Sequence, residues 1–152
     1  MESAKRNLKL RQLATADVDA VVAIQNTSPQ IAQWTPQDYA GLSAAGMTGW
    51  VAEVEGRIAG FLIARRIASE LEILNLAIRP DARRRGMGRA LIQFAFAWGK
   101  EFGATSAFLE VRASNLAALE FYRRHQFKKT GRRHLYYSNP VEDALVLTAS
   151  IT

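Results

Sequence analysis

The sequence predicts a mixed α/β domain from two patterns of hydrophobic residues. Apolar runs at strand spacing alternate along the chain with apolar residues at the spacing of helices. Between Leu71 and Val111 a strand, a helix and a further strand follow one another, an order that favours a right-handed crossover between parallel neighbours. The β runs on either side come in pairs with short turns, which predicts antiparallel hairpins.

The N-terminal third predicts a strand and two helices. Leu8 to Gln12 alternates apolar and polar residues, as a half-buried strand does, and Asp17 to Gln25 carries valines at helical spacing. After a break at Asn26 to Pro29, a second helix is expected to begin at Thr35-Pro36. Thr can cap a helix, and Pro is tolerated at the first helical position.

The central third predicts three strands. Trp50 to Val54 and Ile58 to Arg66 are β-rich runs around a short Glu55-Gly56 turn, which is typical of a hairpin. Leu71 to Ile78 is a continuous apolar run, and such a run favours a strand that is buried on both faces.

The C-terminal part predicts two helices and three strands. Apolar residues recur at helical spacing from Leu91 to Phe102, and Phe108 to Val111 is the next strand. A further helix carries Tyr122. Phe127 to Tyr137 and Asp143 to Ser150 then form a final β pair.

Composition is that of a single globular domain. The 152 residues, 49% of them hydrophobic, suffice for one core, and without a repeat or a linker we expect one domain over residues 1–152. The absence of Cys excludes a disulfide scaffold and thiol catalysis, and two isolated His make a metal centre unexpected. The charged N-terminus and the lack of a long apolar run predict no signal peptide and no membrane partner, so we expect a cytoplasmic location.

The net charge of +6 is concentrated in two segments. Asp81 to Arg89 has four Arg against one Asp, and Leu119 to Leu135 has six Lys or Arg against one Glu. Both a solvated basic surface and a surface that receives a polyanion are compatible with this pattern.

A basic, glycine-containing loop, RRRGMG from Arg83 to Gly88, lies between the buried strand and the long helix. Glycines let backbone N–H groups approach a ligand closely, and a helix N-terminus adds about half a positive charge, so this loop could hold a pyrophosphate. It has neither Walker nor Rossmann spacing, and an ordinary turn at the helix entry is the alternative.

Three polar side chains are further candidates for chemistry. Glu110 lies among apolar residues of a strand, where a carboxylate is costly unless it is paired or functional. The alternative to a function is an ion pair with Arg112 on the same face. Asn115 and Tyr122 are two turns apart on one predicted helix. Their alternatives are an N-cap, for which Ser114 also qualifies, and a core aromatic.

Several short motifs carry a family resemblance. WT precedes the second predicted helix, RxxGxG begins at Arg83, LEVRASN includes Glu110, and YY…EDALVL begins at Tyr136. With these motifs the chain resembles, over nearly its whole length, the GNAT N-acetyltransferases, whose phosphate loop follows Q/R-x-x-G-x-G/A. Within that family it is similar to the RimI-type branch, which acetylates the N-terminal alanine of a small-subunit ribosomal protein.

The resemblance implies a fold and a cofactor. The implied fold is a mixed sheet of about seven strands, flanked by about four helices and splayed between its fourth and fifth strands, here Leu71 to Ile78 and Ser106 to Val111. The pantetheine arm of acetyl-CoA would enter this gap like an extra strand. The residues implied for acetyl-CoA are the backbone of Leu76, Ala77 and Ile78, the loop of Arg83, Arg84, Arg85, Gly86, Met87 and Gly88, and Asn115.

The resemblance also implies roles in the reaction. Glu110 would be the general base and Tyr122 the general acid, with direct transfer and no covalent intermediate. The expected walls of the acceptor groove are Trp34, Tyr136 and Tyr137. The expected partner is the N-terminal peptide of a ribosomal protein.

Two other functions stay open from the sequence. A GNAT enzyme acting on lysines or small-molecule amines would use the same cofactor site. A basic RNA-binding domain would explain the cluster from Lys128 to Arg133, but no RNP, KH or dsRBD signature accompanies it, so nucleic acid is not an expected partner. One departure from the family pattern is Gln126, which stands where a Gly usually precedes Phe and predicts a strained turn.

Overall fold

The structure, a computed structural model, describes residues 7–152. Residues 1–6, which belong to the segment predicted to be neither a signal peptide nor an anchor, lie outside the described residues. Within residues 7–152, no helix combines the length and the apolar character that crossing a membrane requires.

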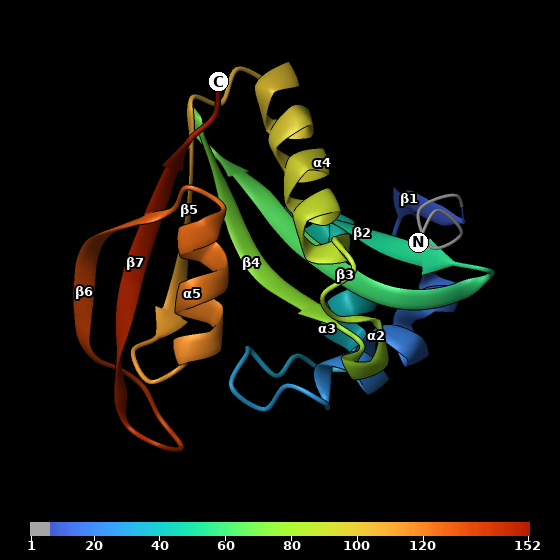
Figure 1. Cartoon of the computed structure of the whole chain (residues 1–152), viewed down its shortest axis with the longest axis horizontal. Coiled ribbons are helices and arrows are strands. Elements are labelled where there is room, and N and C mark those ends of the chain that lie inside the picture. The colour runs from blue at the N-terminus through green and yellow to red at the C-terminus, as the bar shows by residue number, and fades with distance from the viewer. Residues whose placement is uncertain (1–6) are drawn as a thin grey trace.

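The chain forms one seven-stranded sheet with helices on both faces (Figure 1). The strands are β1 (Leu8–Gln12), β2 (Met47–Val54), β3 (Arg57–Ile67), β4 (Glu70–Ile78), β5 (Ser106–Arg112), β6 (Lys128–Tyr137) and β7 (Glu142–Ser150). The helices are α2 (Val18–Gln25), α3 (Pro36–Ala40), α4 (Met87–Glu101) and α5 (Leu116–Arg124), with 3-10 turns at Thr15–Asp17, Ser43–Ala45 and Pro80–Ala82. The predicted mixed sheet of about seven strands, with about four helices, is confirmed.

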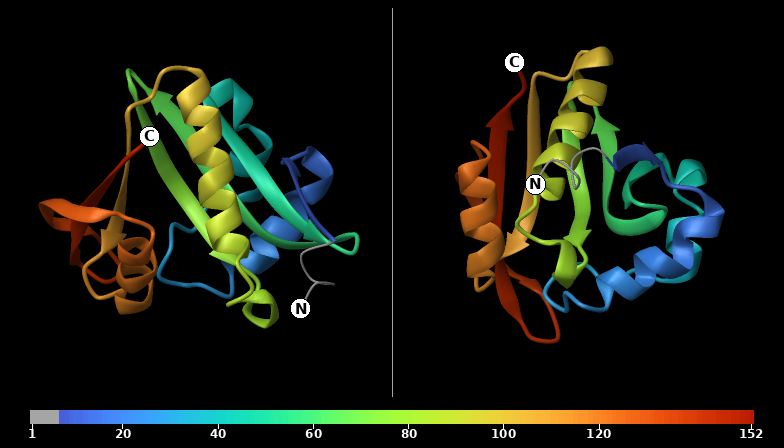
Figure 2. Two further views of the ribbon diagram at one scale, coloured as in Figure 1. Left: turned by 45° about the horizontal axis from the view of Figure 1, so that its top comes forward. Right: turned by 45° about the vertical axis from the view of Figure 1, so that its right-hand side comes forward.

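The core has two layers because side chains alternate between the faces of the central strands. Trp50 and Leu62 pack on one face with residues of α4 such as Leu91. Their neighbours Val51 and Phe61 pack on the other face with residues of α2 and α3. The two views in Figure 2 show α4 and α2 on opposite sides of the sheet. Both faces of β2 and β3 are therefore buried. In β4, whose continuous apolar run predicts burial on both faces, Leu71 packs in the first layer and Ala77 in the second.

Strands β4 and β5 pair in parallel only where they begin. Residues 70–72 of β4 pair with residues 106–108 of β5, and among the described residues 73–78 and 109–112 have no partner across the gap. Figure 1 shows the two strands diverging from this common end. The register of β4 with β3 also skips Leu74, which marks a β-bulge at the start of the divergence. The predicted splay is confirmed, and it leaves one backbone edge of β4 without a strand beside it.

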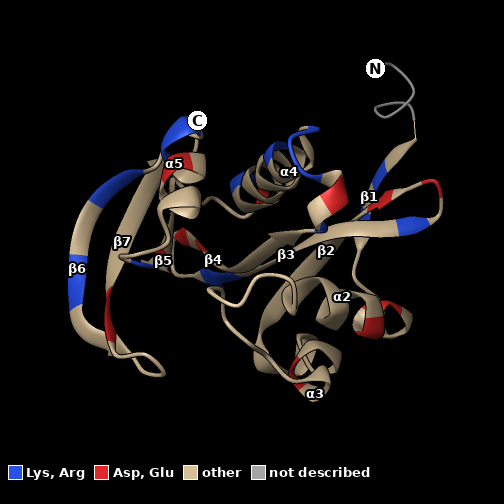
Figure 3. Cartoon of the chain, turned by 60° about the horizontal axis from the view of Figure 1, so that its bottom comes forward, with Lys and Arg blue, Asp and Glu red and all other residues tan. Residues whose placement is uncertain are grey.

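The order β5-β7-β6 at the end of the sheet places β7 inside and β6 at the edge. The sequence predicts the β6–β7 pair but not which of the two strands lies beside β5. In the structure Glu110 of β5 is in register with Val146 of β7, and β6 lies beyond β7. Lys and Arg occur along this edge strand (Figure 3). The basic segment that the sequence singles out is therefore exposed.

The turn from α5 to β6 has the strain that its sequence predicts. Gln126 has a φ of 73°, a left-handed conformation that a Cβ atom disfavours. We expect Gln126→Gly to raise the free energy of unfolding by about 0.5 kcal/mol, because relief of the strain outweighs the greater chain entropy of Gly when unfolded. Urea denaturation measures this change. Arg124→Gly, inside α5, is the control and should lower the free energy of unfolding by about 1 kcal/mol. Destabilisation by Gln126→Gly would contradict the expectation.

Candidate active site

The backbone groups of β4 alternate between β3 and the gap. The Arg79 N–H donates to the Ala59 carbonyl of β3 at 2.7 Å. Because every second residue of an antiparallel pair faces its partner, Ala77 also directs its N–H and C=O to β3. Leu76 and Ile78 then direct theirs to the gap. Of the three backbone positions predicted for the cofactor, only Leu76 and Ile78 can pair with an extended ligand there.

Side chains of the protein already contact these two backbone positions. The Asn75 side-chain oxygen accepts from the Leu76 N–H at 3.2 Å, and the Arg83 guanidinium donates to the Ile78 carbonyl at 3.0 Å. Arg83 also donates to the Ser28 hydroxyl at 3.1 Å. Arg83 therefore ties the loop before α4 to the end of β4 and to the segment after α2.

The loop before α4 leaves backbone N–H groups open to a ligand. Gly86 is the N-cap of α4 with a φ of 83°, and a Cβ atom added there would meet open space. The first bond inside the helix runs from the Ala90 N–H to the Gly86 carbonyl at 2.9 Å. The N–H groups of the first turn have no partner within the helix, and they lie at the positive end of its dipole. This geometry fits a phosphate group.

The other residues of the loop have different surroundings. Arg84 and Arg85 are exposed, whereas Met87 is buried and packs in a small cluster with Ala59 and Ala82. A Cβ atom added to Gly88 would lie 2.9 Å from Cζ of Phe121, so this glycine allows α4 and α5 to approach each other. Gly86 is thus the glycine at the open end of the helix, and Gly88 is a packing residue.

Glu110 lies on the face of β5 opposite to its neighbours Leu109 and Val111, which belong to the core beneath α4. Its carboxylate forms an ion pair with Arg133 of β6 and lies near Tyr136. The side chain is 16% exposed. The carboxylate therefore lies close to the surface, beyond the point where β5 leaves β4.

The alternative pair of Glu110 with Arg112 is wrong. Arg112 instead donates to the Glu142 carboxylate at 3.2 Å and to the carbonyls of Ser138 and Pro140 at 3.1 and 3.0 Å. The inner position of β7 explains the difference, because it brings the hairpin after Tyr137 to Arg112 and places Arg133 within reach of Glu110.

Tyr136 and Tyr137 lie near Glu110, and their role as walls of an acceptor groove stays a prediction. The negative charge of Glu110 raises the pKa of Tyr136, and burial with the same charge raises the pKa of Tyr137 to about 12. The two rings lie 5.2 Å apart, and the Arg112 guanidinium lies 4.5 Å from the centre of the Tyr137 ring. Both hydroxyls therefore keep their protons at neutral pH.

Tyr122 of α5 is a buried aromatic residue with a hydroxyl that can act as an acid. Its ring packs edge-on against Phe121 at 5.2 Å and Phe127 at 5.4 Å. Burial raises its pKa above the ordinary value of 10.0. Within residues 7–152 its hydroxyl has no hydrogen-bond partner. Every fully buried side-chain oxygen of these residues does have a partner, so the Tyr122 hydroxyl is not fully buried and reaches solvent. No hydrogen bond among these residues joins Tyr122 to Glu110.

Asn115 is the N-cap of α5, one of the two caps that the sequence allows. Its side-chain oxygen accepts from the Ala118 N–H at 3.2 Å, and the residue is 8% exposed. The side-chain NH₂ group has no partner among the described residues. A contact of this group with the cofactor remains a prediction.

A buried polar network, which the sequence did not predict, holds the segment between α2 and α3. The Gln25 side chain forms two hydrogen bonds with the backbone of Trp34. Its oxygen accepts from the Trp34 N–H and its NH₂ group donates to the Trp34 carbonyl, both at 3.0 Å. Tyr39 donates its hydroxyl proton to Gln25, and the Asn75 NH₂ donates to the Tyr39 oxygen at 3.0 Å and to the Ala32 carbonyl at 3.2 Å. The network fixes this segment to β4 next to Leu76. A sequence signal exists only in Asn75, a polar residue in an apolar run.

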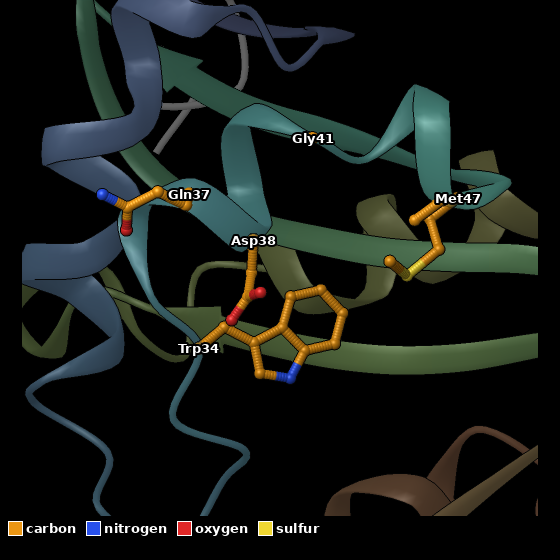
Figure 4. A pocket seen from close by; sticks show the side chains of 6 residues that line it. Trp34, Gln37, Asp38, Gly41 and Met47 are labelled. Atoms are coloured by element: carbon orange, nitrogen blue, oxygen red, sulfur yellow. The ribbon is translucent and has the colours of Figure 1, made fainter.

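Trp34 lines an open pocket of about 340 Å³ between α3 and the start of β2 (Figure 4). The lining residues are Trp34, Gln37, Asp38, Gly41, Ala45 and Met47. The Trp34 ring also packs against Tyr39 at 5.4 Å. Within the described residues no ring contact or hydrogen bond joins Trp34 to Tyr136 or Tyr137. A single groove walled by all three remains a prediction.

The fold agrees with that of one enzyme family. The family model described as "Acetyltransferase (GNAT) family" matches residues 11–127, and the chain belongs to this family. Its acyl donor, in the family as a whole, is acetyl-CoA.

Individual relatives cover nearly the whole chain. The chain is 28% identical over 145 residues to the [ribosomal protein bS18]-alanine N-acetyltransferase of Escherichia coli K12, covering 94% of this chain and 97% of that protein. It is 26% identical over 165 residues to an N-alpha-acetyltransferase of Sulfurisphaera tokodaii, covering 96% and 95%. The crystal structure of the Escherichia coli ribosomal-protein-S18-alanine N-acetyltransferase superposes with a TM-score of 0.82 at 28% identity, covering 95% of this chain and 94% of that one.

Proposed function

We propose that this protein transfers an acetyl group from acetyl-CoA to the N-terminal α-amine of a protein, with the N-terminal alanine of a small-subunit ribosomal protein as acceptor. The similarity to the bS18-alanine enzyme over 94% of the chain supports the acceptor. The observation that carries the proposal is the gap between β4 and β5, with a backbone edge of β4 that has no strand beside it and a near-surface carboxylate, Glu110, on β5. A cytoplasmic location is part of the same proposal.

The residues present fit acetyl-CoA. Leu76 and Ile78 would pair with its extended arm, and the open N–H groups after Gly86 would hold its pyrophosphate, with Arg84 and Arg85 adding positive charge. Asn115 would contact the cofactor through its free NH₂ group. When bound, the cofactor supplies an acyl group that an amine can attack directly. No Cys is needed for this transfer, and the sequence has none.

In this reaction the side chains of the protein would transfer two protons. Glu110 would take a proton from the attacking amine, directly or through a water molecule, and Tyr122 would give its hydroxyl proton to the departing sulfur. The raised pKa of Tyr122 keeps it in the donating form at neutral pH. An N-terminal amine, with a pKa of about 7.8, is already roughly a quarter deprotonated at pH 7.4, so a weak base suffices.

The cofactor site predicts a thermal shift that depends on one glycine. Acetyl-CoA at a hundred times its dissociation constant should stabilise the fold by about 2.7 kcal/mol. Gly86→Val should remove most of this shift, because Val disfavours the left-handed φ and would displace the N–H groups that face phosphate. Gly88→Val should remove it too, through its clash with Phe121.

Gly56→Val is the matched control for Gly86→Val. Gly56 has a φ of 77° and open space around a Cβ atom, but it lies in the turn between β2 and β3. This variant should lose stability and keep the full shift with acetyl-CoA. An unchanged shift in Gly86→Val would mean that the loop is only a turn.

A peptide panel tests the proposed acceptor. Peptides that begin with Ala, Ser or Met are compared with a lysine peptide whose N-terminus is blocked and with a polyamine. The Ala peptide should give the highest kcat/KM. Faster acetylation of the lysine peptide or the polyamine would instead identify an enzyme for lysines or small amines.

A further inference from the structure

Arg133 reaches from the edge of the sheet to the proposed base. It lies on β6 in register with Ala144 of β7, and β7 separates β6 from β5. Its guanidinium pairs with the Glu110 carboxylate and lies 5.2 Å from the centre of the Tyr136 ring. A cation of the protein thus lies where Glu110 and an aromatic ring converge.

A substrate amine needs the same place. An amine that loses its proton to Glu110 must come within about 2.6–3.2 Å of the carboxylate, or one water molecule away. At pH 7.4 roughly three quarters of N-terminal α-amines are protonated, so the arriving group is mostly a cation. Two cations this close repel each other, which favours the departure of Arg133 when the peptide binds.

Arg133 can leave at low cost. Its side chain is 58% exposed, and a pair of this kind is worth about 0.2–1 kcal/mol. The register of β6 with β7 is irregular between Arg133 and Tyr137, and Leu135 within this stretch has a φ of 50°. Arg112 differs in each respect: it is 15% exposed and is bound by Glu142 and two carbonyls.

We propose that Arg133 is an internal substitute for the substrate N-terminus, which occupies the ammonium subsite beside Glu110 in the free protein and is displaced when a cationic peptide binds. This inference rests on the proposed function and adds a regulation of that site. Arg133 is a positioning residue that keeps the Glu110 carboxylate paired until a competing cation arrives. Its removal should favour peptides with a free, charged N-terminus and leave neutral ones unaffected.

Peptide binding to the complex with CoA tests the proposal without turnover. Calorimetry gives the dissociation constants of an Ala peptide and of the same peptide with an acetylated, neutral N-terminus. In Arg133→Met the free-amine peptide should bind about two- to fivefold more tightly than to wild type, and the acetylated peptide should bind as before. In steady-state assays the same variant should lower KM with little change in kcat.

Two further variants sharpen the test. Arg132→Met removes the same charge from the next position, where Arg132 pairs with Asp143, and should leave both constants unchanged. Arg133→Lys keeps a cation and should bind as wild type does. If Arg133→Met does not fold, Glu110→Gln removes the pair from the other side and should abolish the preference for the free amine.

The outcomes separate this inference from the proposed function. Weaker binding of the free-amine peptide to Arg133→Met would show that Arg133 contacts the substrate, and an equal change for both peptides would show a general effect; either overturns the proposal. If wild type does not distinguish the two peptides at all, the proposed function itself fails.

Discussion

Glu110→Gln is expected to lower kcat for an Ala peptide by about 100- to 10,000-fold, the usual range for a general base, and to leave the affinity for acetyl-CoA close to wild type. Gln keeps the shape of the side chain but cannot take a proton. Activity should partly return at high pH, where the amine arrives without its proton. Steady-state kinetics from pH 7 to 10, with the acetyl-CoA dissociation constant measured separately, check both parts.

The Gln variant should fold, which makes the comparison decisive. The lost partner, Arg133, is more than half exposed and can be solvated instead. A folded variant with wild-type kcat would show that Glu110 is a structural residue paired with Arg133. If the variant does not fold, Glu110 likewise has a structural role.

Tyr122→Phe is the second variant with a large expected effect, again about 100- to 10,000-fold on kcat. Phe preserves the ring that packs against Phe121 and Phe127 and removes only a hydroxyl without a hydrogen-bond partner among the described residues. Stability should therefore change little, which urea denaturation checks. Because burial raises the pKa of Tyr122, wild-type kcat should show no loss from its ionisation up to about pH 10.

A control distinguishes the acid from a general effect on this region. Tyr39→Phe removes a buried hydroxyl that bonds Gln25 and Asn75, so it should lose about 1–3 kcal/mol of stability. Tyr122→Phe should show the opposite pattern, with stability kept and turnover lost. Full activity in Tyr122→Phe would exclude it as the acid.

The sequence predicts those parts of the fold that depend on interactions between neighbouring residues. The hairpin around Glu55-Gly56, the helix begun at Thr35 and the strain at Gln126 each depend on neighbouring residues, and the structure confirms all three. The 3-10 turn at Ser43–Ala45 has no such local signal in its sequence and was not predicted.

The contacts of the site depend on strand order, which local patterns do not encode. The sequence predicts that Glu110 is paired or functional, but it does not predict the partner, because the contact with Arg133 depends on the strand order β5-β7-β6. The same holds for Asn75, whose contacts with Tyr39 and Ala32 require α3 to pack on β4. The sequence indicates which residues are candidates for the site, but it does not indicate which residues pair across the strands.

The preference for an N-terminal amine over a lysine is the central claim, and one comparison tests it most directly. A lysine side chain, with a pKa near 10.4, would have to lose its proton at a cost of about 4 kcal/mol at pH 7.4, whereas the same loss costs an N-terminus, with a pKa of about 7.8, only about 0.5 kcal/mol. One Ala peptide that also contains lysines is offered with its α-amine free or chemically blocked, and acetyl transfer is followed by mass spectrometry. The free peptide should gain one acetyl group on its α-amine, and the blocked peptide should gain none. Equal acetylation of the blocked peptide would contradict the account and make this protein an acetyltransferase for lysines.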